Sequence, residues 1–119
     1  MVGGIDDDVS AASGAQIELF RDILLQAKMQ VEGWRGRMLF VYLPDWARYT
    51  SNTSVGEVAR DDVLAMVRAL GIPIIDIHPA FEAHGDPLSL FPFRRPGHYN
   101  EIGHQLVAEA VLKTLAQRQ

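Results

Sequence analysis

The chain has 119 residues, 48% of them hydrophobic, and a formal net charge of −4. This length fits one domain or part of one, the apolar share argues against disorder, and the mixed charges form no basic stripe of the kind that binds nucleic acid. Cysteine is absent, which excludes disulfides and thiolate metal sites. No apolar run approaches the roughly 20 residues that span a bilayer, and the acidic start contains no signal peptide, so the compartment stays open.

The first third of the chain predicts a loop followed by a helix. Residues 1–13 hold two glycines, three consecutive aspartates and several small residues without periodicity, which is typical of a loop. Residues 14–32 predict an amphipathic helix that Gly33 and Gly36 end. Its apolar face comprises Ile17, Phe20, Leu24 and Ala27, with Ile23 and Val31 beside it.

Two short apolar segments predict buried parallel strands. Residues 37–43 and 72–77 are apolar without alternation, which is typical of strands covered on both faces. Pro44 stops the first strand, and Pro73 suits only the first positions of the second.

A helix over residues 57–70 is predicted between these strands, after a polar loop over residues 45–56. Gly71 suits the position just after a helix end. The resulting strand–helix–strand unit predicts a right-handed parallel crossover. The inward side chains of the helix are Ala59, Val63, Met66, Val67 and Leu70.

The last quarter of the chain predicts a rigid loop that delivers a histidine to a closing helix. Residues 78–97 are expected to be a long irregular loop, in which Pro92 and Pro96 each fix φ and lack a backbone donor. Gly97 lets the chain turn sharply just before His98.

The closing helix is expected over residues 101–117. Asn100 is a good N-cap residue, and Glu101 in the first turn complements the helix dipole. The apolar face comprises Ile102, Leu106, Val107, Ala110, Val111 and Leu115.

These elements predict an α/β fold, specifically part of a doubly wound, flavodoxin-like, three-layer architecture forming one unit over residues 1–119. Two parallel strands make a poor sheet, because parallel sheets are normally larger and covered on both faces. We therefore expect either the C-terminal portion of a larger α/β domain or a sheet completed by association with another copy.

Three segments resemble the SGNH (GDSL-type) hydrolase family. The run from Gly97 to His104, Gly-His-Tyr-Asn-Glu-Ile-Gly-His, followed by Leu-Val-Ala-Glu-Ala over 106–110, resembles the family's last block. Residues 39–44 and 72–76 resemble its last two strands, and the order agrees from about residue 14 to 115. The resemblance implies a serine ester hydrolase or acyl-transfer domain without a cofactor, acting on a small ester or acylated substrate.

Carried over by position, His98 matches the family's catalytic base, which activates a serine for attack on an ester carbonyl. The family's acid lies two or three residues earlier, where this chain has Arg95 and Pro96. Neither can orient an imidazolium as a carboxylate would. A substitute acid, or a dyad with a backbone carbonyl orienting the ring, are the alternatives. The carboxylates considered as substitutes are Asp45, Asp86 and Glu101.

The nucleophile of the family stands in a Gly-Asp-Ser block, which this chain lacks. None of its serines, Ser10, Ser13, Ser51, Ser54 and Ser89, has that context. Residues 3–6, Gly-Gly-Ile-Asp, faintly match the family's Gly-x-Asn-Asp block. Ile5 replaces the asparagine, however, and cannot donate a hydrogen bond to an oxyanion. The nucleophile is therefore expected outside this chain, which leaves the isolated chain inactive.

Other polar residues have structural readings beside functional ones. Arg95, Asn100 and Asp45 are expected to contact substrate or the loop. His104 is expected to pack or hydrogen-bond, and Asp76 to cap a loop. Together with His98 and Asp76, the histidines His78 and His84 could suggest a zinc site, but their spacing matches no compact metal motif, so we assign no metal. Arg94 is an anion-binding candidate or a solvated charge, and Trp46 and Tyr49 are expected to pack under their loop.

Two functional hypotheses follow. The first is the C-terminal portion of an SGNH-like hydrolase, with His98 as general base. The second is a non-catalytic α/β module that binds a partner or self-associates. Arg95 and Pro96 in place of the acid favour the second, as does the missing serine block.

Overall fold

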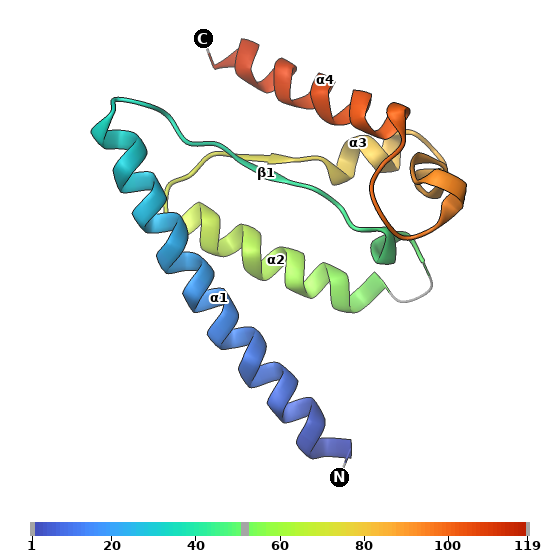
Figure 1. The fold of residues 1–119 in the computed structure, drawn as a ribbon, viewed down its shortest axis with the longest axis horizontal. Coiled ribbons are helices and arrows are strands. Elements are labelled where there is room, and N and C mark those ends of the chain that lie inside the picture. Colours follow the sequence, from blue (N-terminus) through green and yellow to red (C-terminus); the bar gives the residue numbers. More distant parts are fainter. Residues whose placement is uncertain (1, 51–52, 119) are drawn as a thin grey trace.

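The structure is a computed structural model that describes the backbone of residues 2–50 and 53–118, and side chains within residues 14–50 and 60–118. It is a mixed α/β fold, mostly helical, with a two-stranded parallel sheet (Figure 1). Its elements are α1 (Val2–Gly33), β1 (Phe40–Tyr42), η1 (Trp46–Tyr49), α2 (Thr53–Ala69), β2 (Ile74–Asp76), α3 (His78–Ala83), η2 (Pro87–Leu90), η3 (Pro92–Arg94) and α4 (Glu101–Gln117).

The predicted parallel pairing is confirmed, although the strands are short. Phe40 lies opposite Ile74, and Tyr42 lies opposite Asp76. The ladder covers three residues of each strand, fewer than the expected ranges 37–43 and 72–77. Pro44 ends β1, and Pro73 has no N–H to extend β2 toward its start.

Side chains alternate between two apolar clusters on opposite faces of the sheet. The side chains of Leu39, Val41 and Ile75 pack in a cluster on the α4 side of the sheet. Those of Phe40 and Ile74 pack in a cluster on the side of α1 and α2. Figure 1 shows α2 and α4 on opposite sides of β1. The buried members of the α4-side cluster are Ile75, Ile77, Phe81, Leu90 and Phe91, and those of the α2-side cluster are Leu24, Val67, Leu70 and Ile72.

Two helices begin earlier than predicted. The loop expected over residues 1–13 is wrong, because α1 already begins at Val2. The polar loop expected up to residue 56 is shorter, because α2 begins at Thr53. A glycine inside a helix costs only about 1 kcal/mol, and extending a formed helix avoids the cost of nucleation. The glycines that suggested loops are therefore tolerated.

The segment expected to be irregular, residues 78–97, contains one helix and one 3₁₀ turn, whereas the η3 segment has positive φ at Phe93 and Arg94 and is irregular, as are residues 95–97. Its prolines explain the difference. Pro79 and Pro87 each stand at the first positions of such an element. There the missing N–H costs nothing and the fixed φ is already helical. Proline therefore starts α3 and η2, where an irregular loop was predicted.

The closing helix, α4, has the predicted bounds and the predicted N-cap at Asn100. Its central apolar residues pack on the α4-side cluster. The ends of the predicted face are wrong, because Ile102 is 48% exposed and Leu115 is 40% exposed. Ile23 of α1 is likewise 55% exposed.

The molecule is elongated, with extents of 52 × 34 × 18 Å and a radius of gyration of 16.5 Å. A compact domain of this length has a radius of gyration of about 13.5 Å. Part of the difference comes from the start of α1, which projects past the other elements (Figure 1). Within the described residues, no helix is long and apolar enough to cross a membrane.

We expect Phe81→Ala to lower the free energy of unfolding by about 3–5 kcal/mol, because the ring is fully buried and packs on three other aromatic rings. Phe93→Ala is the matched control, since that ring is 93% exposed and its loss should cost less than about 0.5 kcal/mol. Urea unfolding followed by circular dichroism measures both. Equal losses would contradict the assigned core.

Candidate functional site

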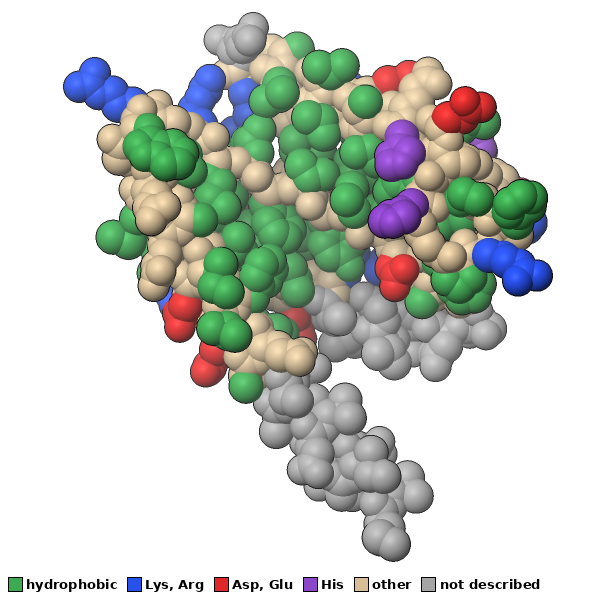
Figure 2. Space-filling view, in the orientation of Figure 1, with side chains coloured by type: hydrophobic (Ala, Val, Ile, Leu, Met, Phe, Trp, Pro, Cys, Tyr) green, Lys and Arg blue, Asp and Glu red, His purple; other side chains and the backbone are tan. Residues whose placement is uncertain are grey.

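His98 lies at the carboxyl end of the parallel strands, immediately before α4. Gly97, with φ +141°, makes the turn that precedes it. The imidazole is exposed and lines an open depression of about 300 Å³. Figure 2 shows histidine side chains on this face, over the loop that leads into α4. The other residues that line the depression are Leu43, Pro44, Asp45, Gly97, Tyr99, His104 and Val107.

Asn100 fixes one end of the His98 loop with three hydrogen bonds. Its side-chain oxygen accepts from the Gly103 N–H at 3.0 Å, which makes it the N-cap of α4. Its amide Nδ2 donates to the Ser89 carbonyl at 2.7 Å, and its backbone N–H donates to the Leu90 carbonyl at 2.8 Å. Asn100 is therefore a loop contact that joins α4 to η2.

Tyr99 anchors the His98 loop to the apolar core. Its hydroxyl donates to the Pro44 carbonyl, and its ring meets the rings of Phe81 and Phe91 with centroids 4.8 and 5.3 Å away. Burial raises the pKa of Tyr99 to about 12, so the hydroxyl stays a donor at neutral pH. A Cβ at Gly103 would lie 2.7 Å from the Tyr99 Cβ, so only glycine allows this packing. His98 is thus held beside two anchored residues.

Of the three carboxylates considered as a substitute acid, only Asp45 lines the depression with His98. Asp86 instead accepts a hydrogen bond from Arg94 at 2.8 Å, which lowers the pKa of its carboxyl. Glu101 is exposed in the first turn of α4. No described side chain forms a hydrogen bond with either ring nitrogen of His98.

The arginines before His98 and the tryptophan of η1 mostly make contacts within the fold. Arg95 is exposed next to Pro96, on the approach to His98. Arg94 has φ 57° and pairs with Asp86, so it is not free for a substrate anion. Trp46 donates from Nε1 to the Arg94 carbonyl at 3.0 Å, which agrees with the expected packing role.

Two of the remaining histidines are engaged in local contacts. The Nδ1 atom of His78 shares a hydrogen bond of 2.8 Å with the Tyr49 hydroxyl. Its Nε2 atom lies 3.5 Å from a carboxylate oxygen of Glu82. Burial, with the nearby Arg48 second, lowers the pKa of His78. His84 approaches the Ser89 hydroxyl at only 3.4 Å. No group of three or more potential metal-ligating residues occurs within the described part of the chain.

His104 stands in the first turn of α4, where its ring meets the edge of Tyr99 with centroids 5.9 Å apart. The serines Ser10, Ser13, Ser51 and Ser54 lie outside the described side chains, as do residues 3–6 and the aspartates at 6–8. Ser89 is described, and its hydroxyl donates to the Asp86 carbonyl at 2.6 Å. It does not line the His98 depression.

Sequence reasoning missed the polar contacts behind the strand ends. Arg60 of α2 pairs with Asp76, and its guanidinium lies 6.0 Å from the ring centre of Tyr42. Asp76 also accepts from the His78 N–H at 3.1 Å, which confirms its expected capping role. Arg48 is buried and lines a second cavity of about 500 Å³ with Tyr49 and other residues. Arg48 stands in a segment without an apolar repeat, so its burial could not be predicted from hydrophobic periodicity.

Comparison with protein-family models, with curated proteins and with solved structures found no match. Chemically, the site offers an exposed imidazole and a carboxylate on the walls of one depression. Such an imidazole can take a proton from a group that another molecule or segment brings to it.

We expect Asn100→Ala to lower the free energy of unfolding by about 1–2 kcal/mol, the usual cost of losing an N-cap. Asn100→Asp is the matched variant, because it keeps the oxygen that accepts from Gly103 and loses the donor to Ser89. Its loss should be smaller. Urea unfolding measures both, and a harmless Asn100→Ala would show that the loop is held without this residue.

We expect His78 to titrate below the ordinary value of about 6.5, because burial disfavours its charged form. The unfolded chain then binds more protons than the folded chain between the two pKa values. Stability contributed by His78 is therefore complete above about pH 6.5 and is lost as the pH falls toward the folded-state pKa. NMR titration of the imidazole and urea unfolding at several pH values measure this. His78→Gln should remove that part of the pH dependence, whereas His98→Gln should leave it in place.

Proposed function

We propose that this chain is the C-terminal portion of an SGNH-like ester hydrolase or acyl-transfer domain, in which His98 is the general base. One observation carries the proposal: an exposed imidazole stands at the carboxyl end of two parallel strands, between a tight glycine turn and a capped helix. Ligands of open α/β sheets bind at this end of the strands. The anchored neighbours Tyr99 and Asn100 supply the fixed position that a base requires.

In this proposal, the imidazole takes the proton of a serine hydroxyl as the serine oxygen attacks the ester carbonyl carbon. The imidazolium then gives that proton to the departing alkoxide as the carbon–oxygen bond breaks. A water molecule repeats the same two steps to release the acid. The serine comes from a part of the protein outside this chain. In this proposal the carboxylate that acts on the imidazolium is Asp45, which lines the same depression.

The proposal also implies that the fold is part of a doubly wound, three-layer sheet. Two features support this reading: β1 and β2 are parallel, and apolar clusters cover both faces of the pair. Phe40 and Tyr42 use their backbone groups to bond toward β2. The N–H and C=O of Val41 therefore point to the open edge of β1, where a further strand would add.

We expect the protein produced from the complete reading frame to hydrolyse p-nitrophenyl acetate, with His98→Ala lowering kcat by about 100-fold or more. His84→Ala is the control, since that histidine is exposed and lies outside the depression. Its activity should be unchanged. Asp45→Asn should lower kcat less than His98→Ala if this carboxylate stabilises the imidazolium. Unchanged hydrolysis by His98→Ala would remove the assignment.

A second candidate function is supported by the open edges of the sheet. Both strands have one unpaired edge within the described residues, and such edges are templates for pairing with another chain. Figure 2 shows apolar side chains gathered on the face that carries β1. A module that self-associates through this edge needs no catalytic serine.

For this second candidate, we expect light scattering after size exclusion to show a dimer or larger assembly of the isolated chain. Val41→Pro should shift it toward monomer, because proline removes the edge N–H while leaving the bonds to β2. Val41→Thr keeps that N–H and is the matched control. A wild-type chain that is folded by circular dichroism and monomeric at millimolar concentration would contradict self-association.

A further inference from the structure

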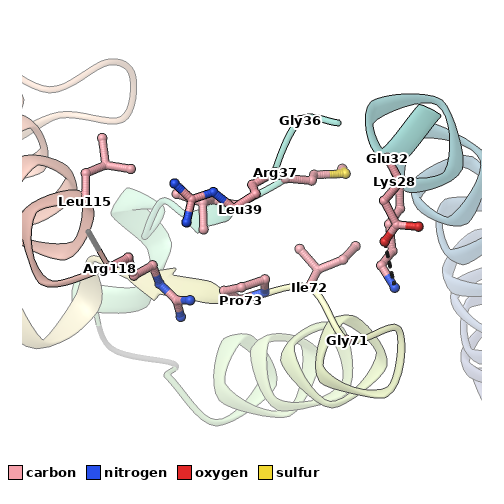
Figure 3. A pocket seen from close by; sticks show the side chains of 11 residues that line it. Lys28, Glu32, Gly36, Arg37, Leu39, Gly71, Ile72, Pro73, Leu115 and Arg118 are labelled. Atoms are coloured by element: carbon pink, nitrogen blue, oxygen red, sulfur yellow. Dashed lines mark ion pairs between the residues drawn. The ribbon is translucent and has the colours of Figure 1, made fainter. Parts of the chain in front are cut away.

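A cavity of about 460 Å³ lies at the amino ends of the strands, away from His98. It opens between the last turns of α1 and α4 and the segments that lead into β1 and β2 (Figure 3). This volume lies within the usual range for small-molecule sites, about 300–1,000 Å³. None of its lining residues belongs to the His98 depression.

The floor and one wall of the cavity are apolar. Met38 and Leu39 come from the approach to β1, and Ile72 and Pro73 come from the approach to β2. Leu115 of α4 adds a side chain that is 40% exposed. Contact with an alkyl chain would remove these surfaces from water. Each methylene that is buried in this way raises the affinity by about fourfold.

The rim carries an excess of positive charge in a chain whose net charge is −4. Lys28 is paired with Glu32 at 3.5 Å, so these two charges offset each other. Arg37 and Arg118 remain, and Figure 3 shows both side chains extending toward the space between α4 and residues 72–73. Neither guanidinium has a carboxylate within ion-pair distance among the described residues.

The helix dipole explains the position of only one of these two arginines. Arg118 is the C-cap residue of α4, where the helix dipole attracts a cation. Arg37 precedes β1 and lies at no helix end. Two guanidinium groups beside an apolar floor match a ligand with one anionic group and one alkyl chain, since guanidinium binds carboxylate by paired hydrogen bonds.

We propose that this cavity binds a medium-chain carboxylate, with its headgroup on Arg37 and Arg118 and its alkyl chain along Met38, Ile72 and Leu115. The inference is independent of the proposed hydrolase function, because the cavity and His98 lie at opposite ends of the strands.

Titration calorimetry of the full chain with sodium decanoate, below the concentration at which decanoate forms micelles, tests the proposal. The expected result is saturable binding of one decanoate per chain. Octanoate, shorter by two methylenes, should bind about 16-fold more weakly. Decanol lacks the charge and should bind at least about tenfold more weakly, and acetate lacks the chain and should show no binding.

Arg37→Gln and Arg118→Gln should each weaken decanoate binding by about tenfold or more. Arg21→Gln removes a charge from exposed α1 surface outside the cavity and should have no effect. Leu115→Gln should weaken decanoate binding through the apolar wall alone. Circular dichroism shows whether each variant is folded.

Three results would overturn the proposal. The first is decanol binding as tightly as decanoate. The second is unchanged decanoate affinity in both folded arginine variants. The third is the absence of saturable decanoate binding below the micelle concentration.

Discussion

The parallel pairing of β1 with β2 determines the placement of everything else. Side chains alternate along both strands, so one set meets α1 and α2 and the other meets α4. A slip of one residue would exchange the two sets, because the side-chain period is two. Burial on both faces therefore fixes the register, even though the ladder is only three residues long on each strand. The same pairing brings the ends of β1 and β2 to one edge, where the polar residues gather.

The position of His98 depends on that pairing through a chain of contacts that starts in the core. Phe81 and Phe91 are buried beneath the loop and receive the ring of Tyr99. Tyr99 reaches the Pro44 carbonyl just after β1, and Asn100 holds the carbonyls of Ser89 and Leu90. The loop is thus tied to three separate elements while the histidine between its ties stays exposed. Rigid backbone under an exposed side chain is the arrangement that functional loops commonly have.

The sequence was informative where a pattern reflected a local physical rule. The closing helix, its Asn100 cap, the parallel pair and the turn at Gly71 all follow from spacing or from single-residue conformational preferences. The prediction of an irregular loop failed where a residue type has different effects at different positions. Proline interrupts a helix in its interior but favours the first turn of one, and Pro79 and Pro87 occupy such first turns. Contacts between distant residues, such as Arg60 with Asp76, leave no periodic signal, so sequence reasoning could not find that pair.

Among the histidines near the carboxyl ends of the strands, His78 and His98 have contrasting surroundings. His78 is partly buried, stacks on Tyr49 and has neighbours at both ring nitrogens. Its nitrogens are occupied and its charged form is disfavoured, which suits a residue that holds α3 against η1. His98 is exposed, and no described side chain occupies its nitrogens. A general base needs a free lone pair and access to the proton it removes. Of these two, only His98 meets both requirements, and the open depression that it lines gives access to the group that would carry the proton.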